Sequence, residues 1–141
     1  MLMRTLAAVA VLVSAAVHLV MWFDGVRDQS VGPAFLLNAF GGVVIAGLLL
    51  GWRHWLPPLL AVGFGVSTLS AFTIATTVGL FGVHDHWQGG YVWTAAIAEA
   101  VAVVAGALVL AQMWTGSPTG TRAGSAAQLQ HRPALRRPHL H

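Results

Sequence analysis

The sequence contains no cysteine and no lysine, and it has very few charged residues of any kind. Without cysteine, the chain can form no disulfide, no thiol redox pair and no thiolate metal site. Only 8% of the residues are charged while 57% are hydrophobic, whereas soluble domains carry about 25% charged residues. Such a chain cannot cover a surface in water. We therefore predict an integral membrane protein of one domain, because 141 residues leave little room for a second.

The sequence also lacks the motifs of common enzyme classes. It has no glycine-rich phosphate loop, no Ser-His-Asp pattern of a hydrolase and no paired carboxylate motif. The segment Gly63-Phe64-Gly65 lies in an apolar stretch and is typical of helix packing. The excess of positive charge comes mainly from the end of the chain, which indicates a basic tail and not a nucleic-acid-binding fold. We expect no enzyme acting on a soluble substrate and no nucleic-acid partner.

Four apolar runs dominate what the sequence does contain. About 20 helical residues are needed to cross the hydrocarbon core of a membrane, and each run is of that order. The runs lack the alternation of strands, and open sheet edges cannot face lipid. Short connections make neighbouring helices antiparallel. The prediction is an all-α, four-transmembrane-helix up-down bundle over residues 1–114, with helices at about 5–23, 34–52, 57–81 and 91–114.

Arginine indicates the orientation of these helices. Arg4, Arg53, Arg122 and Arg132 fall on one side of the bilayer, and only Arg27 falls on the other. Because arginine gathers in cytoplasmic loops, we expect both termini in the cytoplasm. The abundance of alanine, valine, leucine and glycine, with arginine in place of lysine, indicates a GC-rich bacterial coding sequence. The expected location is the bacterial cytoplasmic (inner) membrane.

The two ends of the chain differ in character. The first apolar run continues beyond Ser14-Ala15-Ala16, so we expect a retained helix and not a cleaved signal peptide. Residues 115–141 are rich in Gly, Ser, Thr, Pro and Arg and have little to bury. We predict that they form a disordered, basic cytoplasmic tail.

Small residues recur along the predicted helices, as helix packing in lipid requires. The second run contains Gly47 and Gly51 in a GxxxG arrangement, together with Gly41 and Gly42. Polar residues occur on faces that also carry small residues, so these faces are expected to point into the bundle. With a rise of about 1.5 Å per residue, their polar side chains fall within the outer half of the membrane. The predicted polar layer consists of His18, Asn38, Thr73, Thr77 and Glu99.

Glu99 is the most informative residue of this layer. A carboxylate inside a bilayer is energetically unfavourable and is typical of a functional site. We expect it to be protonated or paired with His18. One interpretation is that the layer hydrogen-bonds the helices together in a non-enzymatic accessory or structural subunit, within a homo-oligomer or a larger membrane complex. The alternative is an outward-facing metal, proton or lipophilic-ligand site centred on His18 and Glu99. The first interpretation is narrowly preferred.

A second candidate site lies in the predicted outer loop, at His84, Asp85 and His86. Two histidines separated by one residue can face the same ion, and an aspartate can add an oxygen ligand for a divalent metal. Hydrated loops also contain such triplets by chance, so we expect the loop to be metal-free. A haem needs two axial histidines at similar depth, and only His18 lies inside a predicted span. We therefore expect no cofactor, with a divalent metal as the alternative.

Three segments resemble small four-helix membrane proteins from GC-rich bacteria: HLVMWFDG, GPAFLLNAFGGVVIAG and VGFGVSTLSAFTIATTVGLFG. The resemblance covers residues 5–114 and implies the four-helix architecture, but it brings no activity with it. Small multidrug exporters differ because their essential glutamate lies in the first helix, where this chain has His18. Vitamin K epoxide reductase-like proteins differ because they need cysteine pairs.

Overall fold

The computed structural model describes residues 1–82, 84, 86 and 89–116. Most of this part of the chain is helical: α1 (Leu2–Phe23), α2 (Gly32–Gly51), α3 (Leu56–Thr77) and α4 (Gly90–Thr115). A short 3-10 helix, η1 (Val26–Asp28), lies between α1 and α2. All four α-helices are long and apolar enough to cross a membrane. The predicted all-α class is confirmed, and the protein is a multi-pass membrane protein.

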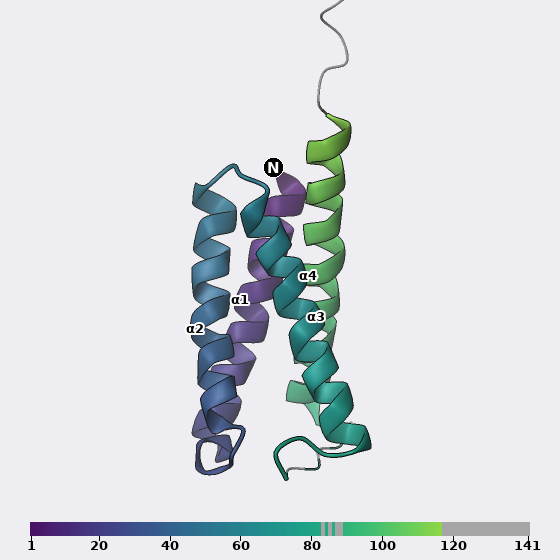
Figure 1. The fold of residues 1–141 in the computed structure, drawn as a ribbon. Helices are drawn as coiled ribbons and strands as arrows, with labels where there is room; N and C mark the ends of the chain where they lie inside the picture. Colours follow the sequence, from purple (N-terminus) through teal and green to yellow (C-terminus); the bar gives the residue numbers. More distant parts are fainter. Residues whose placement is uncertain (83, 85, 87–88, 117–141) are drawn as a thin grey trace, which may run out of the picture.

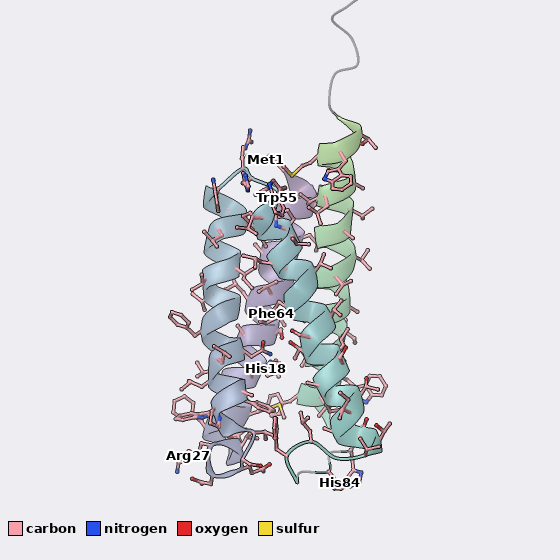
Figure 2. All side chains as sticks on the ribbon, viewed as in Figure 1. Met1, His18, Arg27, Trp55, Phe64 and His84 are labelled. Atoms are coloured by element: carbon pink, nitrogen blue, oxygen red, sulfur yellow. The ribbon has the colours of Figure 1, made fainter. Side chains whose placement is uncertain are left out.

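The helices run up and down beside one another (Figure 1). One end of the bundle holds Met1, the α2–α3 connection and the end of α4, and the other holds η1 and the α3–α4 connection. We call these the Met1 end and the Arg27 end, after two residues labelled in Figure 2. Helix α1 packs extensively against α2 and α4, and α3 packs against α4, whereas α2 and α3 contact each other sparsely. Helices α2 and α3 are therefore the most loosely packed of the adjacent pairs in the bundle.

The limits of α3 follow from its proline and glycine residues. Pro57 and Pro58 begin the helix, where the missing proline N–H is not needed. The sequence predicts a helix that continues to residue 81, but α3 ends at Thr77. Gly79 adopts a left-handed conformation with φ of 85°, and its N–H donates to the Ile74 carbonyl oxygen at 3.0 Å. This glycine geometry ends the helix earlier than its apolar composition indicates.

Three glycines allow close approaches between helices. A Cβ on Gly42 would lie 2.7 Å from a side chain of α1, and one on Gly65 would lie 2.6 Å from a backbone oxygen of α4. A Cβ on Gly106 would lie 2.9 Å from a backbone oxygen of α3. These separations are shorter than real Cβ atoms make. The α1–α2 and α3–α4 pairs therefore depend on glycine at points of close contact.

The predicted GxxxG contact is not formed within the chain. A Cβ on Gly41, Gly47 or Gly51 would meet no atom within 4 Å. Successive residues on a helix point about 100° apart, and the inward face of α2 passes through Gly42 and Ala46. The prediction that Gly47 and Gly51 pack into this bundle is wrong, because the motif lies on the outward face of the helix.

The Met1 half of the bundle contains most of the tightly packed core. Ala7, Val11 and Ala61 are completely buried there. Arg4 donates from Nε to the Leu49 carbonyl oxygen at 3.0 Å, and from Nη2 to the Trp52 carbonyl oxygen. Carbonyl groups at a helix C-terminus lack partners within the helix. Arg4 therefore joins the start of α1 to the end of α2.

Two predictions fall at least partly on residues outside the described part of the chain. The predicted tail lies there from residue 117 onward, and Asp85 of the loop triplet lies there as well. Both stay predictions.

Candidate functional site

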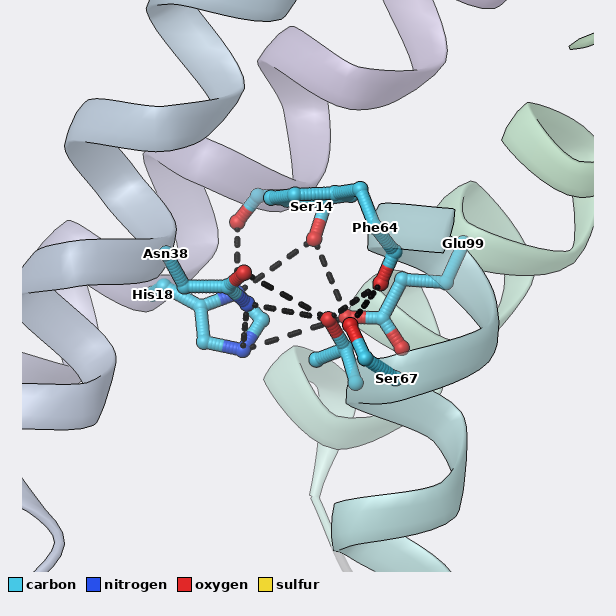
Figure 3. A network of polar contacts seen from close by, with 7 residues as sticks. Ser14, His18, Asn38, Phe64, Ser67 and Glu99 are labelled. Atoms are coloured by element: carbon cyan, nitrogen blue, oxygen red, sulfur yellow. Dashed lines mark hydrogen bonds and ion pairs between the residues drawn. The ribbon is translucent and has the colours of Figure 1, made fainter. Parts of the chain in front are cut away.

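Side chains from all four α-helices meet in one hydrogen-bonded group, which we call the polar cluster (Figure 3). The exposed fractions of His18 and Glu99 are 7% and 2%, so both are buried. Every buried side-chain nitrogen and oxygen in the described part of the chain has a hydrogen-bond partner. Polar groups in a membrane interior must satisfy one another in this way. The cluster consists of Ser14 and His18 from α1, Asn38 from α2, Thr68 from α3 and Glu99 from α4.

Glycine contacts bring the helices together beside this cluster. Asn38 lies one turn from Gly42, where α2 touches α1. Thr68 lies one turn from Gly65, where α3 touches the backbone of α4. Residues three or four apart share a helix face. The close backbone approaches therefore hold short polar side chains within hydrogen-bonding distance across the helix interfaces.

His18 is held in one tautomer by its neighbours. Its Nδ1 lies 2.8 Å from the Ser14 carbonyl oxygen, and its Nε2 lies 3.0 Å from Asn38 Nδ2. A carbonyl oxygen can only accept, so Nδ1 carries a hydrogen and donates it. The Nε2 atom then accepts a hydrogen bond from the Asn38 amide. The Phe35 ring lies 5.0 Å from the His18 ring, centroid to centroid, and packs against it.

The carboxylate of Glu99 faces both α1 side chains of the cluster. The Ser14 hydroxyl donates to Glu99 Oε1 at 3.0 Å, and His18 Nε2 lies 3.8 Å from the same oxygen. The second distance is too long for a hydrogen bond, and Nε2 already accepts from Asn38, so no hydrogen lies between the two atoms. Among the described residues, His18 is the only basic group within 4.0 Å of this carboxylate. The two residues therefore lie side by side as one acidic and one basic group, which we call the acid–base pair.

The structure brings three of the five residues of the predicted polar layer together, namely His18, Asn38 and Glu99. The other two, Thr73 and Thr77, are exposed and lie outside the cluster. Each donates its hydroxyl hydrogen to the carbonyl four residues earlier, at 2.8 Å. A threonine in a helix can satisfy its hydroxyl in this way without any partner helix. The placement of these two threonines in an inward-facing layer is therefore corrected.

Two members of the cluster are absent from the predicted layer. Ser14 lies one turn before His18, and this spacing was a usable signal that the two share a face. Thr68 had no comparable signal, because serine and threonine occur on every side of α3. Its role depends on the rotation of α3 about its axis, which is decided by the contact at Gly65.

A cavity of about 440 Å³ lies between α2 and α3, on the side where these helices contact each other sparsely. Small-molecule sites commonly have volumes of about 300–1,000 Å³. The polar cluster forms one end of the cavity, and His84 lies at the other, toward the Arg27 end (Figure 2). A smaller void of about 40 Å³, lined by both His18 and Glu99, lies on the α4 side of the imidazole. The cavity walls are mainly apolar and include Met21, Phe35, Ala71, Phe72 and Leu80.

The loops at the Arg27 end form the rim of the cavity. Val26, Gln29 and Val31 contribute from the α1–α2 connection, and Phe81 contributes from the α3–α4 connection. The Ser30 hydroxyl donates to the Phe81 carbonyl oxygen at 2.7 Å and joins the two loops. The rim therefore consists of two loops that a hydrogen bond connects, one beside α2 and one beside α3.

No family model, curated protein or solved structure matches the chain. The resemblance to small four-helix proteins of GC-rich bacteria stays a prediction.

The described residues contain no group of three or more His, Asp or Glu side chains that could hold a metal ion. His84 packs against Gly79, where a Cβ would lie 2.6 Å from its ring, and His86 is exposed. His18 is not available as a third ligand, since both of its ring nitrogens bond to protein groups. Because Asp85 lies outside the described residues, the expected metal-free loop and the alternative of a divalent-metal site at the triplet both stay predictions.

Ser14, His18 and Glu99 are the residue types of a hydrolase triad, but their arrangement differs from one. In a triad the histidine accepts the proton of the serine hydroxyl. Here the ring nitrogen nearest the Ser14 hydroxyl, at 3.3 Å, already carries a hydrogen, and that hydroxyl donates to Glu99. Ser14 is also 0% exposed. The geometry supports an acid–base pair behind a ligand-sized cavity, not an activated nucleophile.

Proposed function

We propose that the protein binds a small lipophilic molecule in the cavity between α2 and α3. The supporting observation is a volume of about 440 Å³ that ends on the polar cluster. Binding sites for small molecules are concave and mostly apolar, with a few polar groups that orient the ligand. Aromatic and aliphatic walls with Asn38, Ser67 and Thr68 at one end match this description. The cavity therefore favours the ligand-binding interpretation over the purely structural one that the sequence prefers.

The ligand reaches the cavity from the membrane. The cavity is lined along its length by α2 and α3, which are the neighbouring helices with the fewest contacts between them. A molecule dissolved in lipid can enter between them without crossing the tightly packed α1–α4 side. The polar part of such a molecule would lie at the polar cluster, and its apolar part would lie against Phe35 and Phe72.

We further propose that the Arg27 end faces the outside of a bacterial cytoplasmic membrane. The arginine distribution of the sequence supports this orientation, since Arg4 and Arg53 lie toward the Met1 end. The absence of cysteine makes the test direct. A single cysteine at Gln29 should react with a membrane-impermeant maleimide in spheroplasts, while one at Arg53 should react only after lysis. The reverse pattern would invert the orientation without affecting the cavity.

A structural role is the second candidate function. Every buried side-chain nitrogen and oxygen among the described residues has a hydrogen-bond partner, as expected of groups that fix helix register. In this role the protein is a non-enzymatic accessory subunit of a homo-oligomer or a larger membrane complex. The outward-facing Gly47 and Gly51 would then be available to a partner helix.

Analysis of co-purified small molecules distinguishes these two functions. Ala71→Trp fills the cavity, because Ala71 lines it. Ile74→Trp is the matched control on the same helix, since Ile74 is 43% exposed and faces away from the cavity. A molecule that mass spectrometry detects in fixed ratio to the wild type and Ile74→Trp, but not Ala71→Trp, supports ligand binding. Identical extracts from all three proteins would contradict it.

The proposed function requires no metal and no haem. The elemental content of the purified full chain tests this, after replacement of the tail residues His131, His139 and His141 by glutamine to remove adventitious chelation. A stoichiometric iron, zinc or copper ion would contradict the proposal and make His84 and His86 candidate ligands.

A further inference from the structure

We propose that the cavity selects a neutral amphiphile that donates a hydrogen bond, such as an alcohol or a phenol. This inference rests on the proposed function, because it specifies the chemical class of the molecule that the cavity binds. It follows from the hydrogen-bond partners at the polar end of the cavity, where the available hydrogens are already used and the lone pairs are not.

The tautomer of His18 determines the orientation of the Asn38 amide. Because His18 Nδ1 donates to the Ser14 carbonyl oxygen, Nε2 of the neutral ring has only a lone pair to offer. The group 3.0 Å from Nε2 must therefore be the Asn38 NH₂ group. A reversed amide would place its oxygen against the imidazole lone pair. Asn38 Oδ1 is consequently the atom that points away from His18.

The two hydrogens of the Asn38 amide are both committed. One is donated to His18 Nε2, and the other is donated to Thr68 Oγ1 at 3.3 Å. The Thr68 hydroxyl in turn donates to the Phe64 carbonyl oxygen at 2.7 Å, a closer partner than Asn38 Oδ1 at 3.4 Å. Asn38 Oδ1 therefore remains an acceptor with no strong donor inside the cluster.

Ser67 presents the same chemistry next to Asn38. Its hydroxyl donates to the Phe64 carbonyl oxygen at 3.0 Å, which leaves the lone pairs of its oxygen for the cavity that it lines. The polar end of the cavity is thus rich in acceptors. A ligand hydroxyl can donate to these oxygens, whereas an ether, ester or ketone would oppose its own lone pairs to them. A site built for a hydroxyl discriminates strongly against analogues that lack it.

The ligand is inferred to be uncharged. Among the described residues that line the cavity there is no aspartate, glutamate or arginine, and the ionisable side chains are His18 and His84. Both ring nitrogens of His18 bond to protein groups, His84 lies at the opposite end, and Glu99 lines only the smaller void. An ammonium or carboxylate group at the polar end of the cavity would lose its hydration without a counter-ion. A hydroxyl is therefore the donor that the site can accept.

A matched pair of probes tests the inference: 1-naphthol and its methyl ether, 1-methoxynaphthalene. They share one ring system and differ in the single hydroxyl hydrogen. Binding to the full-length wild-type protein in lipid nanodiscs is measured by titration, with empty nanodiscs as the blank and Ala71→Trp as the blocked cavity. We expect 1-naphthol to bind about tenfold more tightly than the ether, as one net hydrogen bond provides.

Variants at the two acceptors locate the effect. Asn38→Leu should bind the two probes about equally, so that the ratio of their dissociation constants falls to about one. Because this variant also removes a partner of His18, Ser67→Ala provides a milder change that leaves the polar cluster intact and should lower the preference partially. Ile74→Ala, on the lipid-facing side of α3, should retain the full preference.

Any other result of the titration contradicts either the preference for hydrogen-bond donors or the proposed function itself. Equal binding of the two probes to the wild type, above both blanks, would overturn the donor selection and leave the proposed function standing. Tighter binding of the ether would also overturn the donor selection, and it would indicate that the cavity offers donors and not acceptors. Binding of neither probe above the empty nanodiscs and Ala71→Trp would overturn the proposed function together with the inference.

Discussion

Toward the Met1 end, the helices pack through alanine and glycine, and a Cβ on Gly106 would lie only 2.9 Å from the backbone of α3. Toward the Arg27 end, α2 and α3 enclose a cavity of about 440 Å³, and hydrogen bonds of the polar cluster connect the helices. Helices in lipid associate by close packing and by polar contacts, because lipid tails are as apolar as leucine. A groove of about 540 Å³ also lies between α2 and α3 toward the Met1 end, but only apolar residues line it. The comparison therefore indicates that the close contacts toward the Met1 end maintain the bundle, while the cavity toward the Arg27 end is the one that reaches polar side chains.

Polar side chains show the same contrast. Arg4, at the Met1 end, donates to carbonyl groups that end α2, so its bonds are completed within the chain. Asn38 lines the cavity in the other half, uses both amide hydrogens within the chain and leaves its oxygen without a strong donor. The first arrangement stabilises a helix end, while the second also leaves a group for an external molecule.

The largest effect is expected from filling a close glycine contact toward the Met1 end. Gly106→Ala places a methyl group 2.9 Å from the Pro58 carbonyl oxygen. We expect the free energy of unfolding in detergent micelles to fall by about 1–3 kcal/mol, as for other overpacked sites. Gly47→Ala is the control, because no atom lies within 4 Å of its added Cβ. Equal losses for the two variants would contradict the packing described for Gly106.

A loss of similar size is expected from removing the carboxylate of the polar cluster. Glu99→Leu leaves the Ser14 hydroxyl without its side-chain acceptor, and a buried unsatisfied polar group costs about 1–3 kcal/mol. Glu99→Gln keeps an acceptor oxygen, so its cost should be near the 0.6 kcal/mol or so that is typical of a hydrogen bond in a membrane. Chemical unfolding in micelles measures both. An equal, large loss for the two variants would show that the negative charge, not the hydrogen bond, stabilises the bundle.

The same residues explain how far the sequence could predict the site. His18 and Glu99 were predictable because ionisable groups inside apolar spans must avoid lipid, and few positions allow this. Asn38 was predictable for the same reason. Thr73 and Thr77 were not, because their hydroxyls bond to their own helix and impose no direction on it.

Helix rotation and the cavity were harder to predict than the four spans. The number of helices follows from apolar length alone. The inward face of α2 depends on which of its glycines meets α1, and the sequence alone does not distinguish Gly42 from Gly47 or Gly51 in this respect. The cavity depends on the separation of α2 and α3 and on two loops far apart in the sequence. No short segment contains that information.

A further test compares threonines inside and outside the polar cluster. Thr68→Val removes the acceptor of one Asn38 hydrogen and should lower the free energy of unfolding by about 0.6 kcal/mol. Thr73→Val on the same helix should have almost no effect, because Thr73 is exposed and bonds only to its own helix. Measured side by side in the same micelles, a larger loss for Thr73→Val would return this residue to an inward-facing layer.

The smallest effect is expected from enlarging a side chain that lines the cavity between α2 and α3. Ala71→Leu extends a side chain into a cavity of about 440 Å³, so the free energy of unfolding should change by less than about 0.5 kcal/mol. Ala102→Leu makes the same change at a 0% exposed core position, where overpacking costs about 1–3 kcal/mol. Thermal unfolding of the pair measures the difference directly. A large loss for Ala71→Leu would mean that side chains or lipid already fill the space in the folded protein. Tolerance at Ala71 alone would show that the space beside Ala71 is empty in the folded protein, which is the property expected of a cavity that receives a ligand.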